Sequence, residues 1–351
     1  MNFLPSEIIN EILLKVSRPT LYYAAQVCNQ WYQLTLKQII PIVDIETFYK
    51  ASQEDDRLSI TRCEFNVKWL NNGLKGSCLG GHKELVNLMI AKGANRWNDA
   101  LYTSCLGGHK ELAELIITKG ANDFDSAFCG SCLGGHKELI QLMITKGANN
   151  WSRALGSACQ GGHKELVQLL FNKGADRLNE ALYGACLGGH KELTELIITK
   201  ADNTINWNNA LCGACLGGHK QLVDLIISKG ANSWNYALNS ACSGGHLIIV
   251  QLMITKGANN LNIALYNAFG SGSKEVVEYL IIKGANDWNG GLYYACGSGH
   301  SELVQLMIDK GANDWNGALY YACGSGHKKL VHLMITKGAT RCICGRSILN
   351  H

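Results

Sequence analysis

The sequence predicts an all-α protein built as a helical-repeat solenoid, and three observations predict it. A Gly-Gly-His tripeptide or a close variant recurs along most of the 351-residue chain at a spacing of 27 residues, as between His82 and His109. Each copy separates two apolar-periodic segments of helical length. All three prolines lie within the first 41 residues, which marks a boundary between two kinds of structure. Such a period is typical of arrays in which each unit packs against its neighbours.

The histidine of each tripeptide sets the register of ten units. The spacing rises to 29 residues only between His190 and His219, and Ser273 stands in the place of one missing histidine. The units begin at Leu70, Trp97, Phe124, Trp151, Leu178, Trp207, Trp234, Leu261, Trp288 and Trp315. We therefore expect an N-terminal module over residues 1–41, a linker or N-terminal cap over 42–69, the ten repeats over 70–341 and a tail over 342–351.

Two helices fit inside each unit. In the first, apolar Ala and Leu are followed four residues later by a small residue and cysteine, as in Ala100, Leu101, Ser104 and Cys105. The asparagine at the start of this segment, such as Asn98, has the side chain of an N-cap. Gly-Gly then ends the helix. The second segment reads HKELVQLMITK, and its wide apolar face suits a helix packed between neighbouring repeats.

The unit A-L-Y-x-A-C-x-G-G-H-K-E-L-V-Q-L-M-I-x-K-G-A-N resembles the ankyrin repeat, with x-A-L-Y-x-A where the ankyrin consensus has T-P-L-H-x-A. Two features depart from that consensus: alanine replaces the proline in most units, and the period is 27 residues where ankyrin has about 33. About five residues remain between G-A-N and the next helix, too few for the projecting β-hairpin. We therefore expect about ten shortened, ankyrin-like helix–turn–helix units in a nearly all-α solenoid.

The recurrent histidines and cysteines admit a chemical and a structural interpretation, and we favour the structural one. Metal ligands must converge, whereas the nine histidines are spread one per unit; the resemblance implies that each orders the turn between its helices. Nine cysteines sit where Cys packs as a small hydrophobe. Cys342 and Cys344 are too close together and too isolated for a zinc site. Gly-Gly-His-Lys lacks the spacing of a phosphate loop. We expect no metal, no cofactor, no catalytic residue and hence no enzyme.

The positions that vary between units are the candidates for partner binding. The two residues after the leucine of the first helix differ from unit to unit, and in the last three units they are mostly tyrosine. In ankyrin-like arrays this edge lines the binding surface, and tyrosine supplies large contact area at low entropic cost. An alternative is that the tyrosines simply pack. The predicted partner-binding residues are Tyr266, Tyr293, Tyr294, Tyr320 and Tyr321.

Residues 3–36 predict two helices separated at Pro19 and resemble an F-box, with L-P-x-E-I near the start and V-C-x-x-W-x-x-L later. The resemblance implies binding to the Skp adaptor of cullin–RING ubiquitin ligases. An alternative is that these helices only cap the first repeat. The residues that the resemblance assigns to adaptor binding are Leu4, Pro5, Ile8 and Leu13.

The formal net charge is +4, from 32 basic and 28 acidic residues that are interspersed. That balance argues against nucleic acid as the partner. No signal peptide or membrane-length apolar run is present, so we expect a cytoplasmic protein. An F-box followed by repeats rich in Ile, Lys and Asn is similar to the repeat proteins of giant DNA viruses, which implies action in a host cell. The leading interpretation is a ligase adaptor for an unknown target protein, and the alternative is a plain binding or sequestering scaffold.

Overall fold

The structure is a computed structural model that describes residues 49–50, 52–54, 67–200 and 204–340. The predicted F-box residues Leu4, Pro5, Ile8 and Leu13 and the pair Cys342 and Cys344 lie outside the described residues. From Val67 to Thr336 the described chain forms twenty helices, α6 to α25, and none of the described residues is in a strand. The expected all-α helical-repeat fold is confirmed.

Each repeat contributes one first helix and one second helix, joined by the Gly-Gly-His turn. The first helices are α6 (Val67–Gly80), α8 (Trp97–Gly107), α10 (Phe124–Gly134), α12 (Trp151–Gly161), α14 (Leu178–Gly188), α16 (Trp207–Gly217), α18 (Trp234–Gly244), α20 (Leu261–Ser271), α22 (Trp288–Ser298) and α24 (Trp315–Ser325). The second helices are α7 (Lys83–Ala91), α9 (Lys110–Thr118), α11 (Lys137–Thr145), α13 (Lys164–Asn172), α15 (Lys191–Lys200), α17 (Lys220–Ser228), α19 (Leu247–Thr255), α21 (Lys274–Ile282), α23 (Ser301–Asp309) and α25 (Lys328–Thr336).

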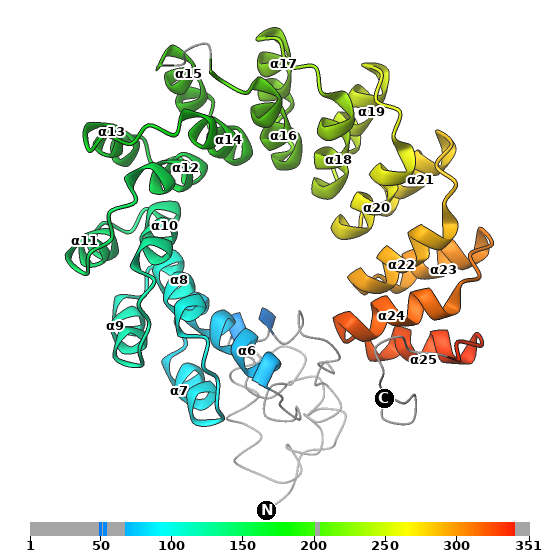
Figure 1. Ribbon diagram of the computed structural model, residues 1–351, viewed down its shortest axis with the longest axis horizontal. Helices are drawn as coiled ribbons and strands as arrows, with labels where there is room; N and C mark the ends of the chain where they lie inside the picture. The colour runs from blue at the N-terminus through cyan, green and yellow to red at the C-terminus, as the bar shows by residue number, and fades with distance from the viewer. Residues whose placement is uncertain (1–48, 51, 55–66, 201–203, 341–351) are drawn as a thin grey trace, which may run out of the picture. The chain divides into compact units, whose positions relative to one another are not determined.

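The helices belong to two compact units, with the division falling within α10. The first unit contains α6 to α9, α10 as far as Ser131, and α11; the second contains Cys132–Gly135 and the chain from Asn149 onward. Within each unit the first helices lie side by side in one row and the second helices form another row (Figure 1). In the second unit each first helix from α12 to α24 contacts the next one, and in the first unit α6 contacts α8.

Small side chains on the first helices allow this close packing. In α12 the residues Ala154, Leu155, Ala158 and Cys159 are fully buried. Alanine and cysteine keep neighbouring helix axes close together, while the leucine fills the space toward the second helix. The second helix buries a wider stripe, such as Leu222, Val223 and Ile226 of α17. Full burial of each large apolar side chain contributes roughly 1.5–3 kcal/mol, and the same pattern repeats in every unit.

The Gly-Gly-His turn joins each repeat to both of its neighbours. The second glycine, such as Gly108 with φ of 84°, ends the first helix in the left-handed region that favours glycine. The Nε2 of His109 donates a hydrogen bond to the carbonyl oxygen of Leu79 in the preceding repeat, at 3.0 Å. A Cβ on Gly108 would lie 2.6 Å from the ring of His136 in the following repeat. The histidine therefore links neighbouring repeats. The resemblance to ankyrin repeats implied only that it orders the turn between its own two helices.

The asparagine near the start of each first helix is not an N-cap, which corrects the interpretation from sequence. Asn98 lies inside α8, which begins at Trp97. Its Oδ1 accepts hydrogen bonds from the backbone N–H groups of Asn122 and Asp123, in the connection that leads to the next repeat, at 2.8 and 3.1 Å. The same bridge recurs along the array, as at Asn235. This asparagine bridge holds the short connection in place where ankyrin repeats have a hairpin.

A short segment ahead of the first repeat packs on α6. Residues 49–50 and 52–53 are helical. Ser52 is fully buried, and the carbonyl oxygen of Gln53 accepts the hydrogen bond from His82 that in later repeats goes to the preceding first helix. A Cβ added to Gly76 of α6 would lie 2.4 Å from the carbonyl oxygen of Tyr49. The segment therefore covers the outward side of α6 as a preceding repeat would.

Candidate protein-interaction surface

One side of each first helix is at least partly accessible after the array has packed, although some of its residues, such as Thr103 and Cys129, are buried. It is formed by the third, sixth, seventh and tenth residues of the repeat, which share a side because they are three or four residues apart. We call these positions the first-helix face. In α22 they are Gly290, Tyr293, Tyr294 and Gly297. The neighbouring residues Leu292, Ala295 and Cys296 are fully buried and therefore unavailable to a partner.

Charge is distributed unevenly along this face. In the first five repeats it carries charged residues, among them Lys75, Asp99, Arg153 and Glu180. From α16 through α24, in contrast, the first helices contain no Asp, Glu, Lys or Arg. Protein interfaces are depleted of charged residues at their centre and enriched in tyrosine. The last five repeats therefore have the composition of an interface core.

The five predicted tyrosines fall into two groups. Three of them are exposed: Tyr294 by 43%, Tyr320 by 46% and Tyr321 by 37%. Tyr266 and Tyr293 are half-buried, and each donates a hydrogen bond from its hydroxyl to the aspartate that caps the next first helix, Asp287 and Asp314 respectively. The structure thus brings all five together, but two of them also serve the contact between repeats.

The tyrosine rings stack into one cluster across α20, α22 and α24. Tyr266 stacks on Tyr294, with ring centroids 4.8 Å apart and planes 11° apart. Tyr293 stacks on Tyr321 in the next repeat, at 5.6 Å. Tyr321 also contacts Tyr294 at 6.0 Å and meets the edge of Tyr320 at 5.6 Å. We call this set of five rings the tyrosine ladder. Its mutual packing holds the exposed edges in place before any partner arrives.

The aspartates under the ladder cap the helices that follow them. Oδ1 of Asp314 accepts from the backbone N–H of Gly317 at 3.0 Å, which makes Asp314 the N-cap of α24. The hydrogen bond from Tyr293, together with those from the backbone, holds the pKa of Asp314 below its usual value. Burial, with the adjacent Asp314 hydrogen bond and charge, raises the pKa of Tyr293 to about 12. At neutral pH the pair is therefore a neutral phenol bonded to a carboxylate.

Two exposed apolar residues on the same face were not singled out from the sequence. Tyr236 of α18 is 72% exposed and Ile263 of α20 is 48% exposed. Both occupy the third position of their repeats, whereas the sequence interpretation considered only the sixth and seventh. That third position also changes from unit to unit, so its variation was an available signal. These residues extend the uncharged face from the tyrosine ladder toward α18.

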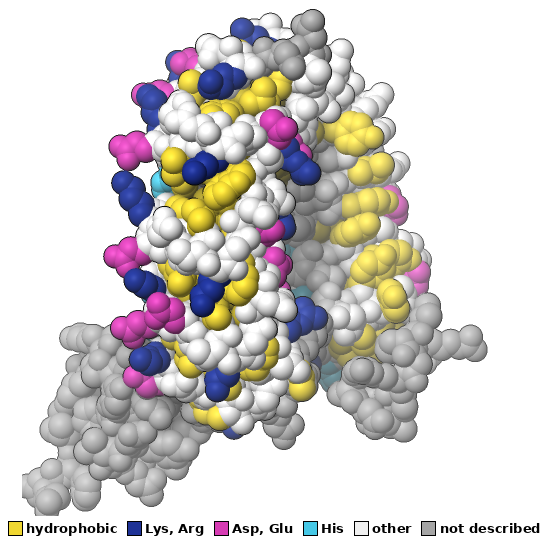
Figure 2. All heavy atoms as spheres, turned by 60° about the vertical axis from the view of Figure 1, so that its left-hand side comes forward, with side chains coloured by type: hydrophobic (Ala, Val, Ile, Leu, Met, Phe, Trp, Pro, Cys, Tyr) yellow, Lys and Arg dark blue, Asp and Glu magenta, His cyan; other side chains and the backbone are white. Residues whose placement is uncertain are grey.

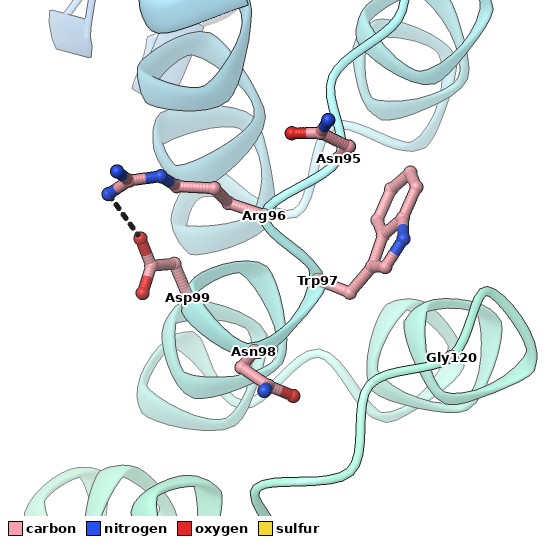
Figure 3. A pocket seen from close by; sticks show the side chains of 6 residues that line it. All are labelled: Asn95, Arg96, Trp97, Asn98, Asp99 and Gly120. Atoms are coloured by element: carbon pink, nitrogen blue, oxygen red, sulfur yellow. Dashed lines mark ion pairs between the residues drawn. The ribbon is translucent and has the colours of Figure 1, made fainter.

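Shallow hollows lie where the first helices begin. One of about 330 Å³ is lined only by uncharged residues, among them Asn206, Cys212 and Tyr236. Another, of about 290 Å³, lies in the first unit beside Trp97 and Gly120 (Figure 3). There Arg96 and Asp99 turn toward each other, away from the Trp97 indole, and form an ion pair of 3.5 Å. The hollow in the second unit is therefore uncharged and the hollow in the first unit is lined by charged residues, which matches the charge difference between their first helices.

The edge formed by the second helices is charged and solvated. Lysine and glutamate of the H-K-E sequence pair between repeats, Lys83 with Glu111 at 3.3 Å and Lys110 with Glu138 at 3.2 Å. Figure 2 shows basic and acidic side chains alternating along this edge. Exposed pairs of this kind contribute roughly 0–1 kcal/mol each. Because both signs alternate, the edge offers no continuous basic surface for nucleic acid.

The recurrent cysteines lie in the core. Burial raises the pKa of the Cys159 and Cys186 thiols to about 12, so these side chains stay protonated and unreactive at neutral pH. Among the residues that the structure describes, no three His, Cys, Asp or Glu side chains converge as metal ligands would. No helix in the described part of the chain is both long and apolar enough to cross a bilayer.

Comparison with known proteins gives two family matches. The family model "Ankyrin repeats (3 copies)" matches residues 155–236, 211–290 and 286–343, which together span more than half of the chain. The F-box domain model matches residues 1–42. No curated protein matches the sequence. The ankyrin repeat domain of human ASB11 is 24% identical over 48% of this chain and 89% of its own, with a TM-score of 0.37. At that TM-score, the family assignment depends on the family models alone.

Proposed function

Because the chain belongs to the ankyrin repeat family, we propose that it is an adaptor that recruits a target protein to a cullin–RING ubiquitin ligase. The repeat array binds the target, and the N-terminal module docks on the Skp adaptor of the ligase. The observation that carries this proposal is the match of residues 1–42 to the F-box domain in the same chain as the array. Both families are protein-interaction modules, and the chemistry of ubiquitin transfer belongs to the ligase.

The uneven charge on the array supports target binding by its C-terminal half. Tyr294 and Tyr321 present large, partly exposed rings that are already ordered by stacking. Residues of this type dominate interface energetics because they bury much area at little entropic cost. We place the target site on the first-helix face from α16 to α24, with the tyrosine ladder as its anchor.

The segment at residues 49–54 supports ligase docking over the alternative that residues 1–41 serve only as a cap. A solenoid needs something to cover the outward side of its first repeat. Ser52 and Gln53 already lie against Gly76 and Gly80 of α6 in that position. Covering α6 therefore does not require the F-box helices, and Leu4, Pro5, Ile8 and Leu13 are assigned to the Skp adaptor.

We assign the site of action to the cytoplasm of a host cell infected by a large DNA virus. This part of the proposal is supported by the sequence organisation, an F-box followed by shortened ankyrin-like repeats rich in Ile, Lys and Asn. Expression of the tagged full chain in a eukaryotic cell and imaging of its distribution would test it. Accumulation in the nucleus or on membranes would contradict the assignment.

Capture of a purified Skp adaptor by the full-length chain tests ligase docking. We expect capture by the wild-type chain and loss of capture when Leu4, Pro5 and Ile8 are all replaced by alanine. Leu169→Ala is the matched control, because Leu169 is an apolar side chain on α13 that is 48% exposed. If the wild-type chain fails to bind under conditions in which a known F-box protein binds, ligase docking is refuted and the plain scaffold remains.

Affinity purification from cells with mass spectrometry tests target binding by the array. The wild-type chain is compared with a Tyr294→Ala, Tyr321→Ala variant and with Tyr102→Ala, which changes the same ring type on α8 outside the uncharged repeats. The target is expected to be lost only from the double variant. That variant should still unfold cooperatively, at a somewhat lower temperature because the stacking of both rings is removed. Retention of every captured protein by the double variant would refute the assignment of the site.

A further inference from the structure

The uncharged face of the last five repeats has two charges at its margin, and both are negative. In the first helices from α16 to α24, together with the residue that precedes each, the charged residues are Asp287 and Asp314. The nearest lysines along the chain, Lys283 and Lys310, are the C-caps of the second helices α21 and α23, outside the first-helix face. The Nζ of Lys283 lies over the ring of Tyr279 on α21, 5.4 Å from the ring centroid. A partner that covers the tyrosine ladder therefore meets a face of net negative charge.

Each of these carboxylates has acceptor capacity left. Asp287 accepts one hydrogen bond from the backbone N–H of Gly290 at 2.9 Å and one from the hydroxyl of Tyr266. Asp314 accepts from Gly317 and Tyr293 in the same way, and also from the backbone of Asn316. An ionised carboxylate offers about four lone-pair sites, so each can accept further donors. Both side chains are half-buried and lie within reach of a partner seated on the ladder.

A partner that excludes water from these carboxylates must supply a compensating charge. Desolvation of an unpaired carboxylate costs several kcal/mol, and an acidic partner would add repulsion. A guanidinium group supplies donors in a planar fork and stacks on aromatic rings, which the ladder provides in the same place. Arginine therefore fits the site better than a neutral side chain, and the phosphates of nucleic acid are disfavoured.

The tenth position of the last three repeats leaves room for a main chain. It is Gly270 in α20, Gly297 in α22 and Gly324 in α24, where α6 and α8 have leucine. A Cβ added at Gly270 or Gly324 would meet no atom of the described residues within 4 Å, and one at Gly297 would make only an ordinary contact with Tyr321. Packing within the array does not require glycine there. The missing side chains instead lower the surface beside the ladder along three consecutive repeats.

We propose that the target presents an extended segment that carries arginine and lacks acidic residues. Its main chain lies along the three glycines, and its guanidinium groups pair with Asp287 and Asp314 against the tyrosine ladder. The inference depends on the proposed function, because it names the class of partner that the array takes.

Selection from a display library of short random peptides on the purified full-length chain tests the proposal. Peptides enriched on the wild-type chain should be rich in arginine and poor in Asp and Glu. An Asp287→Asn, Asp314→Asn variant keeps an N-cap acceptor at both positions but removes the charges. It should lose the arginine preference and bind the selected peptides about tenfold or more weakly, the effect of losing one charged hydrogen bond. Glu302→Gln, an exposed carboxylate on α23, is the matched control and should change nothing.

Three results would overturn the inference: enrichment of acidic or uncharged peptides, no enrichment on the wild-type chain, or unchanged affinity of arginine peptides for the Asp287→Asn, Asp314→Asn variant. Thermal unfolding of each variant identifies any that fail to fold, and Tyr294→Ala provides a second variant at an exposed position. The outcome is separable from the proposed function, since capture of the Skp adaptor and tyrosine-dependent capture of the target are measured without peptides. If those succeed while the arginine preference fails, only this inference is lost.

Discussion

Two glycines of one repeat test whether the histidine turn couples neighbouring repeats. Gly162 and Gly174 have similar backbone conformations, with φ of 80° and 87°. Their surroundings differ: a Cβ on Gly162 would lie 2.4 Å from Cε1 of His190, while one on Gly174 would meet nothing within 4 Å. Replacement of either glycine by alanine places a Cβ on a residue in the left-handed region, which lowers the free energy of unfolding. Only the replacement of Gly162 also disturbs the next repeat.

The expected costs follow from these contacts. Gly174→Ala should lower the free energy of unfolding by about 1–2 kcal/mol, the cost of placing a Cβ in the left-handed region. Gly162→Ala incurs that cost and also displaces His190, whose Nε2 donates to the carbonyl oxygen of Gln160 at 2.9 Å. Loss of that hydrogen bond adds about 1 kcal/mol and overpacking adds about 1–3 kcal/mol. The total for Gly162→Ala is therefore about 3–6 kcal/mol.

Hydrogen exchange read by mass spectrometry measures these costs locally, which suits an array whose repeats can open separately. Gly162→Ala should reduce protection of amides in α12 through α15, and Gly174→Ala should do so much less. Because His190→Ala removes the obstructing ring, the double variant with Gly162→Ala should be less destabilised than the sum of the single variants. Equal effects of the two glycine variants, or strict additivity with His190→Ala, would refute the coupling.

Three further predictions concern the bridges and the core. Asn235→Ala removes the acceptor for two backbone hydrogen bonds, at 2.8 and 3.0 Å, and should lower the free energy of unfolding by about 2 kcal/mol. The control is Asn87→Ala at an exposed position of α7, which should change that free energy by less than about 0.5 kcal/mol. Urea titration measures both values. The pKa of Tyr293 is raised to about 12, so its protonated hydroxyl stabilises the folded state below pH 10, and this stabilisation is lost as pH rises from 10 to 12. The melting temperature of Tyr293→Phe should therefore fall less over that interval than the melting temperature of the wild-type chain. Equal falls would contradict the raised pKa of Tyr293. Cys159 should resist iodoacetamide at pH 8 in the native protein and react with it in urea, as measured by peptide mass spectrometry. Rapid labelling of the native protein would contradict the buried position of the Cys159 thiol.

The helices were predictable because their signals are local. A few neighbouring residues are enough to predict that Val223 and Ile226 share one side of α17, and that a glycine ends each first helix. The shortened connection also followed from counting, since too few residues remain for a hairpin. The helix start was misjudged because Asn98 resembles an N-cap in isolation, and the loop that it binds lies 24 residues further along the chain.

The candidate surface was predictable in part. Variation between repeats pointed to the sixth and seventh positions, and with them to the five tyrosines. It could not separate Tyr293 from Tyr294, which are adjacent in sequence. Tyr293 reaches Asp314, the N-cap of the next first helix, while Tyr294 remains 43% exposed. That difference arises from the rotation between neighbouring side chains on a helix, combined with the position of the next repeat.

The sequence by itself determined the all-α class, the period of 27 residues and the two helices of each unit, because apolar spacing and glycine placement act over a few residues. Only the tertiary structure decided how the helices and connections contact one another: that His109 bonds to the preceding repeat, that Asn98 binds the connection after its own second helix, and that the tyrosines stack into a ladder. Those contacts join residues more than twenty positions apart, and their geometry depends on how one repeat sits on the next.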